Sequence, residues 1–453
     1  MHALQADLLV VGGKILTLDD RWTEIDDGAL AVAGGAIVAL GPREEVQGRY
    51  LAREVLDASG RLIMPGLINA HTHAPMTVFR GLADDLPLDT WLKEYIWPAE
   101  AQHVNPDMVY WGTQLAAAEM IQSGIVAFAD MYFYEDDIGR AARDAGIRVV
   151  LGEALVDFPS PNTKTPEEGL AYVRESFARW AGDPWVTVGL QPHSTYACSP
   201  DLLVRAKELA AEFGAIYLIH AAETAQEVED VRRRYGRSPV GHLEALGILD
   251  ARVVLAHGVH LTEDEIALLA ERGASVAHCP ESNMKLASGV APLPALRRAG
   301  VNVALGTDGA ASNNDLNLWG EMGTAAKLHK VWSGDPTVVS AREVVWMATR
   351  GGARALGLED RLGSLEVGKR ADFLCLDLDA PHMVPLYDTY SHLVYAARPS
   401  DVRTVVIEGR VVYDEGEWKT IDLPRVYAHV RALAGQLVGR WARDPNWRNT
   451  VGQ

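Results

Sequence analysis

The middle of the chain alternates short apolar runs with longer segments whose apolar residues recur at helical spacing. Eight of the apolar runs predict strands, at 62–69, 125–131, 148–156, 186–192, 216–221, 253–258, 274–278 and 302–307. Capping residues open the helices predicted between them: Ser199 precedes a first-turn proline, and Thr262 and Ser340 are each followed by glutamate three residues later. Eight such repeats over about 250 to 300 residues favour an α/β fold of the (β/α)8 TIM-type barrel class over an open doubly wound sheet.

Both ends of the chain read as short strands instead. Residues 1–60 hold apolar runs bounded by Gly12-Gly13 and Gly34-Gly35, which predict hairpins. Residues 366–453 hold two further strand-like runs, at 371–376 and 402–407, and then a helical tail over about 424–442. Neither end has enough strands to bury a face. We therefore expect both ends to form one small composite β-sandwich, with the barrel occupying residues 61–365.

Composition narrows the class of protein. The 453 residues leave room for one large and one smaller domain, and 48% hydrophobic with 23% charged residues is ordinary for a globular protein. The formal charge of 42 − 61 = −19 disfavours nucleic-acid backbones and anionic lipid as partners. Three widely spaced cysteines, no signal-peptide pattern and no stretch of about 18 apolar residues predict a cytoplasmic protein without a membrane segment.

Two histidines follow the first predicted barrel strand. His71 and His73 stand two residues apart after an apolar run, and residues two apart on a strand share a face. Two imidazoles on one face can bind one metal ion. A pair of exposed loop histidines is the alternative, because the motif is short.

Polar residues also end most of the other predicted strands, where barrel active sites lie. The set is rich in imidazole and carboxylate, which suits one divalent ion, zinc or iron(II). We predict four metal ligands: His71, His73, His220 and Asp308. Glu223 is the predicted general acid/base, and His257 the group that orients the attacking hydroxide. For each of these histidines taken alone, a buried structural role is the alternative.

Several other chemistries lack their motifs. The chain has no Gly-x-Gly-x-x-Gly after a strand, no phosphate-binding loop ending in Gly-Lys-Ser/Thr and no His-Glu-x-x-His. The Cys-rich zinc signature of cytidine-type deaminases is absent as well. The fourth barrel strand offers His193 and no lysine, so a carbamylated lysine between two metals is not predicted there.

These residues in this order resemble the amidohydrolase superfamily, and more closely its 5-methylthioadenosine/S-adenosylhomocysteine deaminase family. The stretches that carry the closer resemblance are 79–88, 96–100, 278–286 and 309–314. The resemblance implies that Glu100 and His193 contact the substrate. It also implies that Glu223 contacts the base and moves the proton, and that Asp308 binds both metal and the attacking water.

The activity implied by the resemblance is hydrolytic deamination of 5′-methylthioadenosine or S-adenosylhomocysteine to the inosine analogue and ammonia. Another nucleobase or triazine aminohydrolase is the alternative enzyme, and a non-catalytic metal-binding scaffold is the alternative of another class. We expect a nucleoside substrate and, from symmetry statistics, a homodimer or tetramer. Whether Trp91, Trp97 or Arg148 contacts the substrate is left open.

Overall fold

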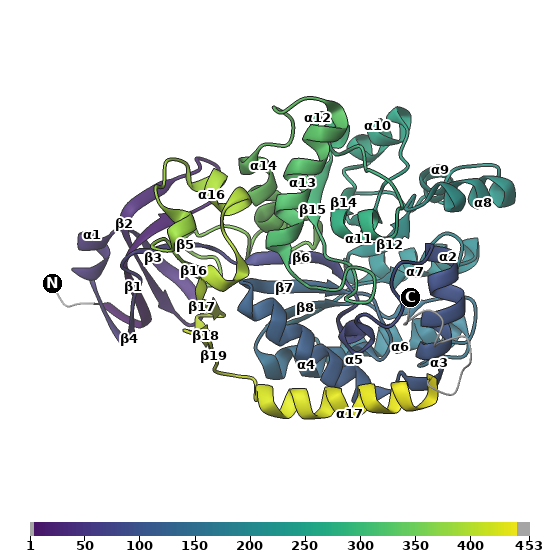
Figure 1. Ribbon diagram of the computed structural model, residues 1–453, viewed down its shortest axis with the longest axis horizontal. Coiled ribbons are helices and arrows are strands. Elements are labelled where there is room, and N and C mark those ends of the chain that lie inside the picture. The colour runs from purple at the N-terminus through teal and green to yellow at the C-terminus, as the bar shows by residue number, and fades with distance from the viewer. Residues whose placement is uncertain (1–3, 442–453) are drawn as a thin grey trace. The chain divides into compact units, whose positions relative to one another are not determined.

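The central part of the chain forms a closed barrel of eight strands. The computed structural model describes residues 4–441 (Figure 1). One sheet has the order β10-β8-β7-β6 and the other the order β12-β13-β14-β15. The barrel strands are β6 (Leu67–Thr72), β7 (Ile125–Asp130), β8 (Arg148–Leu151), β10 (Val186–Val188), β12 (Tyr217–Ala221), β13 (Val253–His257), β14 (Ser275–His278) and β15 (Asn302–Leu305).

Two links close the barrel between these sheets. A parallel bridge pairs Leu190, just after β10, with Tyr217 of β12. On the other side the Asp308 amide donates to the His71 carbonyl oxygen at 3.0 Å. The predicted (β/α)8 barrel is confirmed.

Strands from both ends of the chain form a separate sheet of nine strands. Its order is β19-β18-β17-β16-β5-β1-β2-β3, with β4 paired to β1. The antiparallel pairing of β5 with β16 joins the two ends, as expected. The members are β1 (Leu4–Leu16), β2 (Glu24–Ala33), β3 (Ala36–Pro42), β4 (Tyr50–Asp57), β5 (Arg61–Pro65), β16 (Phe373–Asp377), β17 (Val402–Ile407), β18 (Arg410–Asp414) and β19 (Glu417–Trp418).

The core of this sheet follows from the two-residue period of a strand. Along β1, Leu8 and Val10 join one buried apolar cluster, whereas Leu9 and Val11 join another. Successive side chains of a strand point to opposite faces, so these two clusters cover the two faces of the sheet.

Two predicted strand assignments need correction. Residues 62–69 are not one strand: β5 belongs to the nine-stranded sheet and β6 to the barrel, with Gly66 between them. A Cβ atom on Gly66 would lie 2.2 Å from Val126 Cγ1, so the chain turns there with no room for a side chain. The predicted hairpin at Gly12-Gly13 is also wrong, because β1 runs through it with a register shift. Gly12 has φ +84° and absorbs the irregularity.

Two more of the predicted strands are each divided into two shorter strands. The run 148–156 contains β8 and the short β9 (Ala154–Leu155), and the run 186–192 contains β10 and β11 (Gln191–Pro192). The Gly34-Gly35 turn does join β2 to β3.

The predicted caps open their helices. Ser199 accepts a hydrogen bond from the Leu202 amide, and Thr262 and Ser340 each form a capping box. The helical tail is Leu423–Trp441; the predicted residue 442 lies outside the described part of the chain. No helix within residues 4–441 is both long and apolar enough to cross a bilayer.

The helices are α1 (Arg43–Gln47), η1 (Ala74–Phe79), α2 (Leu88–Thr90), η2 (Trp91–Ile96), α3 (Trp97–His103), α4 (Pro106–Gln122), α5 (Glu135–Ala145), α6 (Pro166–Arg179), α7 (Pro200–Phe213), α8 (Ala225–Tyr235), α9 (Pro239–Ala245), α10 (Glu263–Arg272), α11 (Pro280–Lys285), α12 (Leu293–Arg298), α13 (Leu318–Ser333), α14 (Ala341–Trp346), η3 (Met347–Gly351), α15 (Gly352–Ala355), η4 (Pro381–Met383), α16 (Thr389–Tyr395), η5 (Pro399–Asp401) and α17 (Leu423–Trp441).

The described residues fall into two compact units. One comprises 4–69, 119–127 and 317–420, and the other comprises 70–118, 128–316 and 421–441. The unit boundaries run through β6 and β7, so the predicted division into 1–60, 61–365 and 366–453 stays a prediction. Every residue of the site described next belongs to the second unit.

Candidate active site

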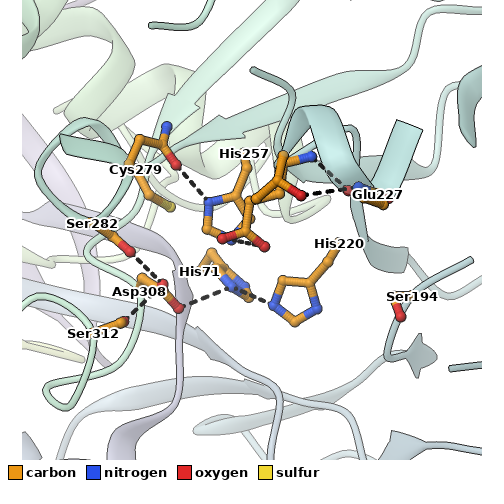
Figure 2. A network of polar contacts seen from close by, with 12 residues as sticks. His71, Ser194, His220, Glu227, His257, Cys279, Ser282, Asp308 and Ser312 are labelled. Carbon is orange, nitrogen blue, oxygen red and sulfur yellow. Dashed lines mark hydrogen bonds and ion pairs between the residues drawn. The ribbon is translucent and has the colours of Figure 1, made fainter. Parts of the chain in front are cut away.

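Four side chains converge at the carboxyl ends of the first, fifth and eighth barrel strands. One ligand atom from each of His71, His73, His220 and Asp308 lies within 4.8 Å of every other. His71 Nε2 is 3.1 Å from His220 Nε2 (Figure 2). His73 Nε2 is 3.1 Å from Asp308 Oδ1. The four predicted ligands therefore lie together.

Hydrogen bonds to the far side of each ring and carboxylate orient this cluster. His220 Nδ1 bonds to the His193 carbonyl oxygen at 2.7 Å, and His73 Nδ1 bonds to the carbonyl oxygen of Met131. A carbonyl oxygen can only accept, so each Nδ1 carries a proton, and in the neutral ring Nε2 then has the lone pair. This is the tautomer that a metal ligand requires.

Asp308 is oriented by two hydroxyl groups. Ser282 and Ser312 donate to Asp308 Oδ2 at 2.7 and 2.8 Å, which leaves Oδ1 to face the histidines (Figure 2). Asp308 itself has φ +61°, a conformation that is uncommon outside glycine, although aspartate tolerates it better than most residues. The backbone turn and the two serines together aim one oxygen at the cluster.

The electrostatics of the cluster favour a bound cation. Burial lowers the pKa of His71 to about 4 and lowers the pKa of His220 well below its usual value, so both rings are neutral at pH 7. Burial also acts to lower the pKa of His73, but the Asp308 carboxylate outweighs it and raises the pKa to about 9. Two neutral imidazoles, and a carboxylate strong enough to attract a proton onto the third, are a donor set that fits zinc or iron(II), whose charge would take the place of that proton.

Glu223 and His257 stand next to the cluster. The backbone amides of Ala222 and Glu223 donate to the Glu227 carboxylate at 3.1 and 2.7 Å, which holds the turn that follows β12. Glu223 Oε2 lies 3.8 Å from His257 Nε2. Burial raises the pKa of Glu223.

The His257 ring is held from behind. Its Nδ1 is 2.9 Å from Asn283 Oδ1, and its backbone has φ +72°. Burial acts to lower the pKa of His257, but the carboxylates of Glu223 and Asp308 raise it overall. The ring therefore presents Nε2 to Glu223 and favours the charged form.

A cavity of about 520 Å³ opens onto these groups. Glu100 and His193 line it together with His73, Glu223 and Asp308. Burial raises the pKa of Glu100 to about 7. The volume lies within the range of about 300–1,000 Å³ that is typical of small-molecule sites.

The sequence left open whether Trp91, Trp97 and Arg148 contact the substrate. Trp91 and Trp97 both line the cavity. Arg148 begins β8, where its guanidinium donates to the Pro184 carbonyl oxygen and lies over the Trp185 ring. It is not among the residues that line the cavity.

Four groups that orient the site were not predicted: Glu227, Ser282, Asn283 and Ser312. Two weak signals were available. Glu227 stands four residues after Glu223, and the three others lie in the stretches 278–286 and 309–314 that carry the family resemblance. Ser282 and Asn283 each bond to a partner 26 residues away, which spacing alone could not identify. The site partners of Glu227 and Ser312 lie within five residues, but the turns that bring them together are not visible in the pattern.

Comparisons with known proteins agree on the family. The model of the amidohydrolase family matches residues 62–412. A 5-methylthioadenosine/S-adenosylhomocysteine deaminase from Syntrophobacter fumaroxidans is 52% identical over 434 residues, which cover 96% of this chain and 99% of that one.

Two solved structures extend the likeness to the fold. An adenosine deaminase from Xanthomonas campestris with bound zinc has a TM-score of 0.94 and 40% identity, covering 96% of this chain and 99% of that one. An atrazine chlorohydrolase from Arthrobacter aurescens complexed with zinc has a TM-score of 0.87 and 27% identity, covering 94% and 100%. The chain therefore belongs to the amidohydrolase family, as its motifs predicted, and its relatives include the 5-methylthioadenosine/S-adenosylhomocysteine deaminases.

Proposed function

We propose that this protein is a metal-dependent hydrolytic deaminase of adenine nucleosides, with an inosine-type product and ammonia. One observation carries the proposal: four metal-ligand atoms lie within 4.8 Å of one another, and three of the four residues line a cavity together with a buried carboxyl and a buried imidazole. The names of the relatives support the nucleoside substrate.

The proposed cofactor is one divalent ion, zinc, held by His71, His73 and His220 through Nε2 and by Asp308 through Oδ1. An ion of this kind lowers the pKa of a coordinated water to about 7, which supplies the nucleophile at neutral pH. The zinc-containing neighbours support its identity, and His193 in place of a lysine supports a single ion. Elemental analysis of the purified protein tests both the identity and the stoichiometry.

Glu223 is the proposed proton carrier. Its carboxylate accepts the proton of the attacking water and passes it to a ring nitrogen of the purine. Water adds to carbon 6, and the proton given to the ring nitrogen stays there in the inosine-type product. The second proton of the water moves from the new C6 hydroxyl, through Glu223, to the exocyclic nitrogen. The bond from carbon 6 to that nitrogen then breaks, and ammonia leaves. The raised pKa of Glu223 makes the carboxyl a better acid for the second transfer.

His257 and Asp308 hold the attacking oxygen. Asn283 fixes the His257 ring so that Nε2 faces the reacting centre, and this ring stabilises the negative charge that develops there. Glu100 and His193 contact the nucleoside from the cavity wall.

The decisive experiment is ammonia release from adenosine, 5′-methylthioadenosine and S-adenosylhomocysteine by zinc-loaded protein. Turnover of at least one of them with the matching inosine product supports the proposal. A second candidate, a nucleobase or triazine aminohydrolase, is favoured by the atrazine chlorohydrolase neighbour. Release of ammonia only from guanine or an aminotriazine would select that candidate instead.

We also propose that the protein acts in the cytoplasm as a dimer or tetramer. Its three cysteines, Cys198, Cys279 and Cys375, are buried thiols, which suits a reducing compartment. Light scattering after size-exclusion chromatography tests the oligomeric state.

A further inference from the structure

The wall of the cavity changes character away from the proposed metal ligands. Most of the groups proposed for the chemistry come from the ends of the barrel strands. One group of large apolar side chains comes instead from the segment 88–97 and from the loop after β9: Leu88, Trp91, Leu92, Ile96, Trp97 and Phe158. We refer to these six residues as the apolar wall.

The apolar wall is assembled from two separate stretches of chain that meet. The Trp97 and Phe158 rings are 5.8 Å apart between centroids. Four of the six residues also line a neighbouring cavity of about 840 Å³, so the wall stands between the two spaces. The apolar wall therefore lines both spaces, as Glu223 does.

No lysine or arginine lines the cavity among the described residues, whereas Glu100, Glu223 and Asp308 are carboxyls. The lining groups that favour positive charge are His73 and His257, and both face the carboxylates of the proposed metal site. A carboxylate held away from that site would be desolvated without a lysine or arginine to pair with. Such burial is unfavourable, because the charge loses its water and gains no partner.

The neighbouring cavity is no more favourable for a buried carboxylate. Lys285 lines it, but its ammonium already donates to Asp84 Oδ1 at 2.6 Å, to the Ala311 carbonyl oxygen at 3.3 Å and to Asn314. Lys93 lines it too, in company with four carboxyl groups, from Asp85, Glu223, Glu227 and Asp230. The potential there remains unfavourable for an anion.

The placement of a nucleoside follows from the proposed chemistry, on which this inference rests. Carbon 6 must lie at Glu223, His257 and Asp308, and the ribose hydroxyls need polar partners such as Glu100 and His193. The 5′ substituent is the part of the nucleoside farthest from carbon 6. We propose that the apolar wall receives this substituent and selects nucleosides whose 5′ group is uncharged and apolar, such as methylthio, over those that carry a carboxylate.

The test compares kcat/KM of the zinc-loaded protein for 5′-methylthioadenosine and S-adenosylhomocysteine, with adenosine as a third substrate. We expect the carboxylate-bearing substrate to be at least about tenfold poorer than the methylthio compound. Equal or better turnover of S-adenosylhomocysteine would overturn the inference and leave the proposed function standing. No turnover of any of the three would overturn the proposed function and this inference with it.

A pair of variants separates charge from shape. The Phe158 side chain is 42% exposed, so replacing it does not open the core. Phe158→Arg adds a cation to the apolar wall and should raise the kcat/KM of S-adenosylhomocysteine relative to 5′-methylthioadenosine by about tenfold or more. Phe158→Gln removes the same ring without adding charge and should leave that ratio within about twofold. Equal shifts in both variants, or none in Phe158→Arg, would contradict selection by charge.

Discussion

Burial has opposite consequences in the nine-stranded sheet and in the candidate active site. The sheet buries side chains such as Leu8 and Phe373, for which leaving water is favourable. The site buries His71, His220 and Asp308, which are unfavourable to bury without partners. The nine-stranded sheet is therefore stabilised by its own packing. The candidate active site depends on hydrogen bonds and on the ion it is proposed to hold.

The largest expected effect is on turnover, with no effect on either region's fold. Glu223→Gln keeps the size of the side chain but removes the proton acceptor, so kcat should fall by about 10²–10⁴-fold. Metal content should not change, because Glu223 is not among the four proposed ligands. Glu229→Gln, on the exposed side of α8, is the matched control. A near-normal rate in Glu223→Gln would refute its assigned role.

The next largest effect separates the sheet from the site. Phe373→Ala leaves a cavity beneath a fully buried ring and should lower the free energy of unfolding by about 3–5 kcal/mol. Urea unfolding measures this change, and Val367→Ala, at a side chain 64% exposed, serves as control. The folded variant should keep the metal content and KM of the parent protein. Loss of metal in the folded variant would contradict the separation.

A smaller effect tests how the site orients its carboxylate. Ser312→Ala removes one of the two hydroxyls that donate to Asp308 Oδ2, so zinc affinity should fall by about 10–100-fold. Competition with a chromophoric chelator measures the affinity. Ser333→Ala, at the exposed end of α13, is the control. Unchanged affinity in Ser312→Ala would mean that Ser282 suffices.

The smallest effect concerns charges outside both regions. Arg174 forms a two-bond pair with Glu212 at 2.5 and 2.7 Å, and both side chains are about half exposed. Water and salt screen such a pair, so Arg174→Ala should leave the urea midpoint within experimental error. A clear drop in stability would show that exposed charges in this protein contribute more than their setting suggests.

Local patterns in the sequence account for much of the fold. Helix caps at Ser199, Thr262 and Ser340 depend on residues three positions away, so the pattern predicts them correctly. The same reasoning failed at Gly66 and at Gly12-Gly13. There the outcome depends on Val126 across the fold and on pairing with β2, and neither can be read from the local run.

The residue types and spacing along the chain were enough to identify eight barrel strands, the family, and the side chains now found together at the strand ends. Only the structure showed that Ser282 holds Asp308, that Asn283 holds His257, and that the apolar wall lines the cavity. The reason is physical: strand ends and caps are set by neighbours in sequence. Hydrogen-bond partners and cavity linings come instead from segments that only three-dimensional packing brings into contact.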